Sequence, residues 1–216
     1  MNLPIPPGTI FNAQCGFIEV VSLLGRGKSG YSHLARVGAR DRVLKIMHDE
    51  PCAYYDFAGT NKCALEVKAY SRLRAMGLPM PRLLEYDTRR QYIVKEYVEG
   101  PHGGQMAAQG ELSDTHFIQL RRLSTLLRQH DLNIDWFPNN FVGTPEGLVY
   151  VDYEHNPYDA QWSFEEWGVW YWANSEGMGR FLKDEDPAHI NEPPLSGLPI
   201  RANPERVAHI LSLPSE

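Results

Sequence analysis

Three polar residues near the middle of the chain have side chains and a spacing suited to chemistry on a phosphate group. Asp135 and Asn140 stand five positions apart, and Asp152 follows twelve positions later. Phosphoryl transfer needs a carboxylate to orient the attacking hydroxyl, and oxygen ligands to hold Mg²⁺ against the phosphates. A loop followed by a short β-hairpin would bring these groups to one point. We therefore take Asp135 as a candidate base, and Asn140 and Asp152 as candidate metal ligands.

A second candidate site lies near the start of the chain, in the run Gly25-Arg26-Gly27-Lys28-Ser29-Gly30. Glycines let a backbone approach phosphate oxygens, and the amides of such a turn can point at an anion. A dinucleotide-binding unit would need a helix next, but residues 32–37 and 42–47 have strand composition. A glycine loop between antiparallel strands is the better interpretation, and a plain tight hairpin is the alternative.

A lysine and a glutamate downstream of this loop are candidates for an ion pair. Lys45 interrupts an otherwise apolar strand, which invites a partner. Residues 61–76 have helix composition, with Asn61 as N-cap and Gly77 as stop. Glu66 lies beside the stripe that we expect to be buried, close enough to meet a cation. The alternatives are an exposed lysine on an edge strand and a solvated glutamate. The expected stripe consists of Ala64, Val67 and Tyr70.

The elements around these residues predict an α+β fold with two lobes. Residues 1–16, rich in proline and glycine, are expected to form a leading arm. Residues 17–98 are expected to form a β-rich lobe with one main helix, with strands at 17–24, 82–87 and 92–98. Residues 99–216 are expected to form a short, mainly helical lobe that carries the Asp135 loop.

Three patterns define the second predicted lobe. Ser113 can cap a helix over residues 114–130. A run of aromatic residues within 158–174 is more typical of a core helix than of a ligand platform. The tail meanders through several prolines to a short helix near residues 205–213. The buried stripe expected on the helix over residues 114–130 consists of Phe117, Leu120, Leu123 and Leu127.

Composition excludes several classes of protein. The chain has 216 residues, 43% of them hydrophobic and 22% charged, which is typical of a globular protein with a buried core. A net charge of −6 gives no electrostatic footprint for nucleic acid. We find no signal peptide and no apolar run of about 18 residues, and we expect neither a nucleic-acid partner nor a membrane partner. Cys15, Cys52 and Cys63 lack zinc-site spacing and are expected to be reduced thiols in the cytoplasm.

Together these features resemble the protein-kinase-like superfamily, in the family's own order, from Phe17 to about Trp172. In that family a glycine-rich hairpin covers the nucleotide phosphates, and Gly25, Gly27 and Gly30 match it. A strand lysine paired with a helix glutamate grips the α- and β-phosphates, and Lys45 and Glu66 match that pair.

The resemblance extends through the second half of the chain. Glu96-Tyr97-Val98 looks like the hinge that receives the adenine, and residues 135–140 look like the catalytic loop. Asp152-Tyr153-Glu154 stands where the metal-binding motif begins. The resemblance implies a kinase that uses ATP and Mg²⁺ and phosphorylates a hydroxyl. Its implied catalytic residues are Asp135, Lys45 and Glu66, its metal ligands Asn140 and Asp152, and its nucleotide-binding residues Gly25, Gly27, Lys28, Ser29, Gly30, Lys45, Glu96 and Val98.

Departures from the family pattern leave the acceptor open. Asn133 and Ile134 replace the family's histidine and arginine, so control through a phosphorylated activation loop is not expected. Glu154 replaces a glycine, as in choline and ethanolamine kinases, and no Ala-Pro-Glu motif follows it, as in RIO-like kinases. The acceptor is therefore a protein serine or threonine or a small alcohol. The alternative is an inactive, nucleotide-binding pseudokinase, which the presence of Lys45, Asp135 and Asp152 disfavours.

Overall fold

The computed structural model describes residues 3–51, 57, 59–194 and 197–215, so Cys52 lies outside the described residues. The chain divides into two compact units. Unit 1 comprises Met1–Met76 and Pro81–Tyr97, and unit 2 comprises Gly77–Met80 and Val98–Glu216. The boundary after Tyr97 is one residue from the one expected from the sequence. The fold class is α+β, as predicted.

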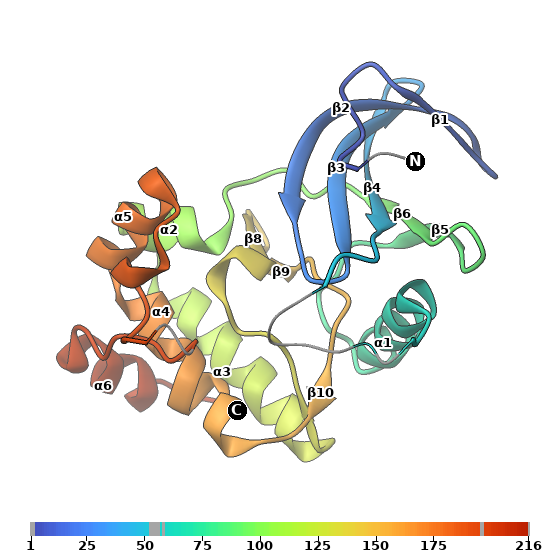
Figure 1. The fold of residues 1–216 in the computed structure, drawn as a ribbon. Coiled ribbons are helices and arrows are strands. Elements are labelled where there is room, and N and C mark those ends of the chain that lie inside the picture. Colours follow the sequence, from blue (N-terminus) through green and yellow to red (C-terminus); the bar gives the residue numbers. More distant parts are fainter. Residues whose placement is uncertain (1–2, 52–56, 58, 195–196, 216) are drawn as a thin grey trace. The chain divides into compact units, whose positions relative to one another are not determined.

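Unit 1 is a six-stranded antiparallel sheet in the order β1-β2-β3-β4-β6-β5. Figure 1 shows that its strands curl strongly. Part of this curl has a local cause, because β2 departs from regular pairing with β3 between Val20 and Ser22 and again between Leu23 and Gly25. Such bulges bend a strand and increase its twist. The strands are β1 (Ile10–Ala13), β2 (Gly16–Arg26), β3 (Gly30–Val37), β4 (Arg40–Met47), β5 (Leu83–Asp87) and β6 (Tyr92–Glu96).

The prediction of a leading arm over residues 1–16 is wrong for its second half. Residues 10–13 form β1, which pairs with β2, and Phe11 and Ala13 are buried while Ile10 is exposed. This alternation is that of a strand with one face on the core. The preceding prolines obscured it in the sequence. The core of unit 1 consists of Ile5, Phe11, Ala13, Ile18, Val20, Ala35, Leu44, Ile46, Tyr92 and Val94.

The helix of unit 1, α1 (Lys62–Ala75), begins as predicted, since the Asn61 side chain accepts a hydrogen bond from the Ala64 N–H. It packs beside β5 (Figure 1). The predicted buried stripe is wrong, because Ala64 is exposed and Val67 and Tyr70 are only half-buried. Glu66 itself lies on the buried face, although a hydrophobicity pattern would place a glutamate in solvent. The buried residues are Lys62, Cys63, Glu66, Ala69 and Leu73.

Unit 2 is mainly helical, with two small two-stranded sheets. None of the helices in the described part of the chain is both long and apolar enough to span a bilayer. The helices are α2 (Gly103–Gln109), α3 (Asp114–Gln129), α4 (Val169–Ala173), α5 (Ser175–Asp184) and α6 (Pro204–Ser212), and a π-helical turn over Phe164–Gly168 leads into α4. The strand pairs are β7 (Leu132–Asn133) with β10 (Asn156–Pro157), and β8 (Phe141–Thr144) with β9 (Gly147–Tyr150).

Two of these helices were not predicted from the sequence. Helix α2 begins with two glycines, which disfavour a helix by themselves. Packing explains the first one, because a Cβ atom on Gly103 would lie 2.6 Å from both the Pro138 carbonyl oxygen and the Trp172 ring. Helix α5 was assigned to the meandering tail. By contrast, α3 has the predicted stripe, with Phe117, Leu120, Leu123 and Leu127 buried.

Aromatic side chains form the centre of unit 2. The Trp136 ring packs against Phe141 and Phe164, with centroids 6.2 and 5.4 Å apart, and Phe141 packs against Trp172 at 5.4 Å. All four are fully buried. The prediction that the aromatic run is core is confirmed for Phe164 and Trp172, but Trp162 is 40% exposed. Because Trp136 and Phe141 flank residues 137–140, this core holds the candidate loop at both ends.

Candidate functional site

The structure brings Lys45 and Glu66 together within unit 1. The Lys45 Nζ lies 2.5 Å from the Glu66 Oε1, and the residues are only 6% and 7% exposed. Burying either charge alone would be costly, but the paired charges compensate each other. The lysine is therefore directed inward from β4 to meet the helix, which excludes the alternative of an exposed lysine on an edge strand.

The glycine run forms the hairpin between β2 and β3, and His48 braces it. The Gly27 N–H donates to the Gly30 carbonyl at 2.9 Å, and the His48 N–H donates to the Ser29 carbonyl at 3.1 Å. The His48 Nδ1 accepts from the Glu50 N–H at 3.1 Å. A neutral imidazole then has its proton on Nε2, which lies 3.0 Å from the Gly27 carbonyl oxygen. His48 thus ties the loop to the end of β4.

The two halves of this glycine loop differ. Gly25 and Gly27 are exposed, and a Cβ atom at either position would meet little or nothing. Gly30 is buried, and a Cβ atom there would lie 2.5 Å from the Ile46 carbonyl oxygen. Ser29 is also buried, and its hydroxyl donates to the Glu66 Oε1 at 2.6 Å. The Ser29 hydroxyl thus joins the buried half of the loop to the glutamate of the ion pair on α1.

The predicted hinge residues fall in different units. Glu96 ends β6 in unit 1, whereas Val98 belongs to unit 2. The Glu96 Oε1 lies 3.0 Å from the Arg82 guanidinium, and its Oε2 accepts from the Arg82 N–H at 3.1 Å. The Glu96 N–H donates to the Arg82 carbonyl at 3.0 Å. Arg82 therefore occupies both the side chain and the N–H of Glu96.

The three candidate residues Asp135, Asn140 and Asp152 are linked within unit 2. The Asn140 Nδ2 donates to the Asp135 carbonyl at 3.3 Å, and the Asn140 carbonyl accepts from the Val151 N–H at 2.8 Å. Val151 immediately precedes Asp152. The Asp135 Oδ1 accepts from the Phe137 N–H at 3.0 Å, which fixes the carboxylate at the start of the loop. Asn140 thus connects the backbone at Asp135 to the backbone at Val151, next to Asp152.

A buried tyrosine reports the electrostatics of this cluster. Burial raises the pKa of Tyr150 well above its ordinary value, and the negative charges of Asp152, Asp135 and Glu154 raise it further, in that order. Three carboxylates therefore act on one hydroxyl. The Tyr150 hydroxyl donates to the Glu154 carbonyl at 3.2 Å. Carboxylates gathered around the end of β9 would favour a cation there.

The donor set fits Mg²⁺. This ion takes hard oxygen ligands, uses one or two carboxylates, and completes its shell with water and phosphate. Asp152 offers a carboxylate. Asn140 donates through its amide nitrogen to the Asp135 carbonyl, so its amide oxygen points away from that carbonyl and can act as a ligand. Within the described ranges no group of three or more His, Cys, Asp or Glu is placed to hold a metal by itself.

Sequence reasoning missed the residues that brace the candidate loop. The Trp136 Nε1 donates to the Asn133 Oδ1 at 2.8 Å, and the Asn133 Nδ2 donates to the Asp159 carbonyl at 3.2 Å. The Trp172 Nε1 donates to the Trp136 carbonyl at 2.8 Å. The sequence offered one sign of this bracing, namely Asn133 at the position where the kinase pattern has a histidine. Nothing local indicates Trp172, because it is distant in the sequence.

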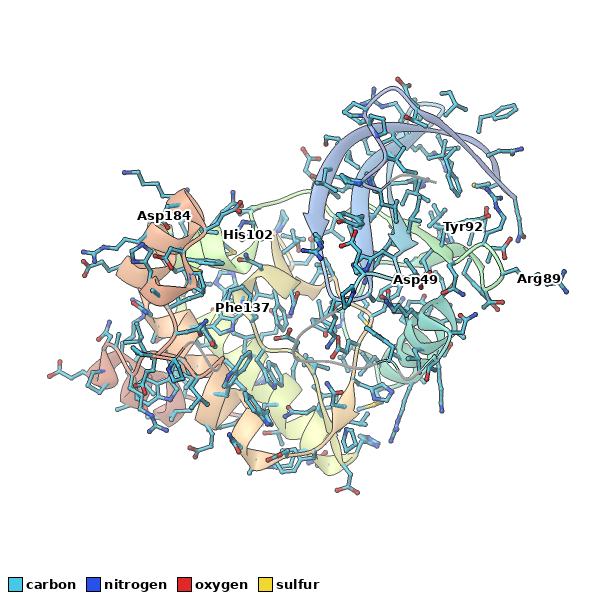
Figure 2. All side chains as sticks on the ribbon, viewed as in Figure 1. Asp49, Arg89, Tyr92, His102, Phe137 and Asp184 are labelled. Carbon is cyan, nitrogen blue, oxygen red and sulfur yellow. The ribbon has the colours of Figure 1, made fainter. Side chains whose placement is uncertain are left out.

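Phe137 anchors the loop from another side. Figure 2 labels this ring, which packs against Tyr171 at 5.2 Å and Phe181 at 6.0 Å between centroids. The Tyr171 hydroxyl donates to the Asn191 Oδ1 at 2.6 Å. Burial raises the pKa of Tyr171, and the charge of Asp135 adds to the rise. The catalytic-loop candidate is thus held by rings from both α4 and α5.

No protein-family model and no curated protein matches the sequence. Among solved structures, the chain is similar to a point mutant of the PknI kinase domain of Mycobacterium tuberculosis, with 20% identity and a TM-score of 0.48, over 70% of this chain and 63% of that one. It is also similar to vaccinia related kinase 3, with 16% identity and a TM-score of 0.44, over 71% and 53% of the two chains. Each match spans less than two thirds of the other protein's chain.

Proposed function

We propose that this chain, which has a protein-kinase-like fold, is an ATP- and Mg²⁺-dependent phosphotransferase that transfers the γ-phosphate of ATP to a hydroxyl group. The observation that carries the proposal is the buried Lys45–Glu66 ion pair beside a glycine hairpin. A fully buried lysine on a strand needs a reason, because an apolar side chain would pack there at lower cost. Contact with nucleotide phosphates supplies that reason.

Different residues contribute different parts of the reaction in this proposal. Lys45, held by Glu66, contacts the α- and β-phosphates, and the exposed half of the glycine loop covers them. Asp135 accepts the hydrogen bond of the acceptor hydroxyl and takes its proton. A bond then forms between the acceptor oxygen and the γ-phosphorus, while the bond from that phosphorus to the β,γ-bridging oxygen breaks. Asn140 and Asp152 would hold Mg²⁺, which would neutralise charge on the phosphates.

The acceptor is a protein serine or threonine or a small alcohol. A transfer assay with radiolabelled ATP decides between them, using generic protein substrates, aminoglycosides and amino alcohols in parallel. Label on protein alone excludes the small alcohols, and label on one alcohol class alone excludes protein.

The same assay separates an enzyme from a pseudokinase. The proposal predicts ADP in proportion to the labelled product. If Mg²⁺ and ATP raise the melting temperature but no acceptor gains label and no ADP forms, the chain is a nucleotide-binding module without turnover.

A further inference from the structure

Tyr150 is a buried group that the proposed reaction does not use. It ends β9, two residues before Asp152, and its side chain has no exposed surface. Its hydroxyl donates to the Glu154 carbonyl at 3.2 Å. This bond closes a short ring of the chain that contains Val151, Asp152 and Tyr153. A single hydroxyl therefore limits how far the predicted metal ligand can move.

We propose that Tyr150 is the positioning residue that holds Asp152 in register with Asp135. The inference rests on the proposed function for the roles of these two aspartates, but the bond itself is independent of those roles. Tyr150 acts through the backbone of residues 152–154 and does not touch substrate, because it is fully buried.

The local electrostatics explain why such a tie is needed. Asp152, Asp135 and Glu154 all act on the Tyr150 hydroxyl, so three charges of the same sign lie near one another. Like charges repel more strongly near a protein interior than in water, and the repulsion favours separation of the segments that carry them. The neutral Tyr150 hydroxyl bonds to the Glu154 carbonyl and also has a hydrogen bond with the Asp135 backbone, so it links the two segments without adding another charge. The tie matters most before a metal arrives.

The rest of the Tyr150 side chain is anchored independently of its hydroxyl. Its ring packs on Phe141, with centroids 5.2 Å apart, and its N–H donates to the Pro79 carbonyl at 2.8 Å. Both contacts survive replacement by phenylalanine. Tyr150→Phe therefore removes the hydroxyl's bonds to the Glu154 carbonyl and the Asp135 backbone and leaves the packing in place.

A matched control exists in unit 1. Tyr92, labelled in Figure 2, is equally buried, and its hydroxyl donates to the Glu85 carboxylate. Tyr92→Phe thus removes a buried tyrosine hydroxyl that bonds to no residue of the predicted machinery. Any effect common to the two variants measures the general loss of a hydroxyl.

The experiment compares wild type, Tyr150→Phe and Tyr92→Phe in kcat, in the KM for acceptor and in the Mg²⁺ concentration for half-maximal rate. Loss of one hydrogen bond corresponds to roughly tenfold in rate or binding. We expect Tyr150→Phe to lower kcat about tenfold and to raise the Mg²⁺ requirement several-fold, with the KM for acceptor unchanged. Tyr92→Phe should change none of the three. Equal changes in both variants, or none in Tyr150→Phe, would overturn the inference.

Hydrogen exchange gives a readout that needs no activity. The Tyr153 N–H donates to the Asp152 Oδ1 at 2.9 Å, and the Val151 N–H donates to the Asn140 carbonyl at 2.8 Å. In Tyr150→Phe these two amides should exchange faster, whereas Tyr92→Phe should leave them unchanged. Faster exchange in Tyr150→Phe, together with no phosphotransfer by the wild-type protein, would support the tie and reject the proposed function. Unchanged exchange would reject the tie whatever the activity.

Discussion

The two charged regions of this protein are stabilised in opposite ways. In unit 1 the charge of Lys45 is balanced inside the fold by Glu66, to which Ser29 adds a hydrogen bond. In unit 2 three carboxylates act together on Tyr150, and the groups that brace their segments are neutral amides, indoles and a phenol. The contacts described in unit 1 thus pair a cation with an anion, whereas those described in unit 2 come from neutral groups. Changes in unit 1 should therefore alter stability and nucleotide affinity, and changes in unit 2 should alter turnover.

The largest effect should follow Asp135→Asn, which removes the proposed base from unit 2. A positioned base contributes about 10²- to 10⁴-fold to rate, so kcat should fall by that factor while the Kd for nucleotide stays nearly constant. Steady-state transfer rates and titration with ATP measure the two quantities. Unchanged turnover would show that Asp135 is not the base, and a large rise in Kd would contradict the division of roles between the units.

Glu66→Gln tests the opposite region. It removes the carboxylate charge that lies 2.5 Å from the buried Lys45 ammonium, and removing one partner of a buried pair costs about 3–5 kcal/mol. The free energy of unfolding, measured with urea, should fall by this amount. As a control, the double variant Lys45→Met, Glu66→Leu should lose less stability than Glu66→Gln, although it should bind nucleotide weakly. Equal stability of Glu66→Gln and wild type would mean that the pair is not buried in solution.

A pair of glycine substitutions sharpens the contrast within the loop. Gly30→Ala places a Cβ atom 2.5 Å from the Ile46 carbonyl oxygen, whereas Gly25→Ala meets nothing within 4 Å. Overpacking typically costs about 1–3 kcal/mol, so Gly30→Ala should lower the free energy of unfolding by that amount. Gly25→Ala should leave stability unchanged and weaken nucleotide binding, if this exposed part of the loop covers the phosphates. Equal destabilisation by both variants would contradict the two-sided loop.

How much of this could be predicted from the sequence depends on the range of the interactions involved. The glycine hairpin, the cap at Asn61 and the stripe of α3 follow from local patterns, and the structure confirms them. The buried face of α1 does not follow, because a glutamate becomes a buried residue only when a partner such as Lys45 reaches it. Likewise, β1 could be recognised only through its pairing with β2.

The candidate site shows the same limit. Asp135, Asn140 and Asp152 were found because a known motif fixes their spacing. The residues that hold them were not found, because Trp172 reaches the loop from a distant helix and the Tyr150 bond depends on how the chain turns after β9. Motifs therefore identify groups that do chemistry, whereas the groups that position them emerge from tertiary packing.

The smallest effect concerns pH. Burial lowers the pKa of His33 below its ordinary value of 6.5, and its neutral Nε2 accepts from the Ile5 N–H at 3.2 Å. The unfolded chain binds the proton more readily, so stability is full above about pH 6.5 and falls as the pH decreases below it. Denaturant titrations at pH 7 and pH 5.5 should show this loss, and His33→Gln should reduce it. Burial also lowers the pKa of His102 and His116, so His33→Gln should keep part of the loss of stability between pH 7 and pH 5.5. A loss equal to that of wild type would exclude His33 as a cause.

The most direct measurement of the central claim is a crystal structure with a non-hydrolysable ATP analogue and Mg²⁺. The account predicts a metal ion about 2.1 Å from an Asp152 carboxylate oxygen. It also predicts the Lys45 ammonium within about 3 Å of an α- or β-phosphate oxygen of the same nucleotide. A nucleotide bound away from Lys45, or a metal held by residues other than Asp152, would contradict it.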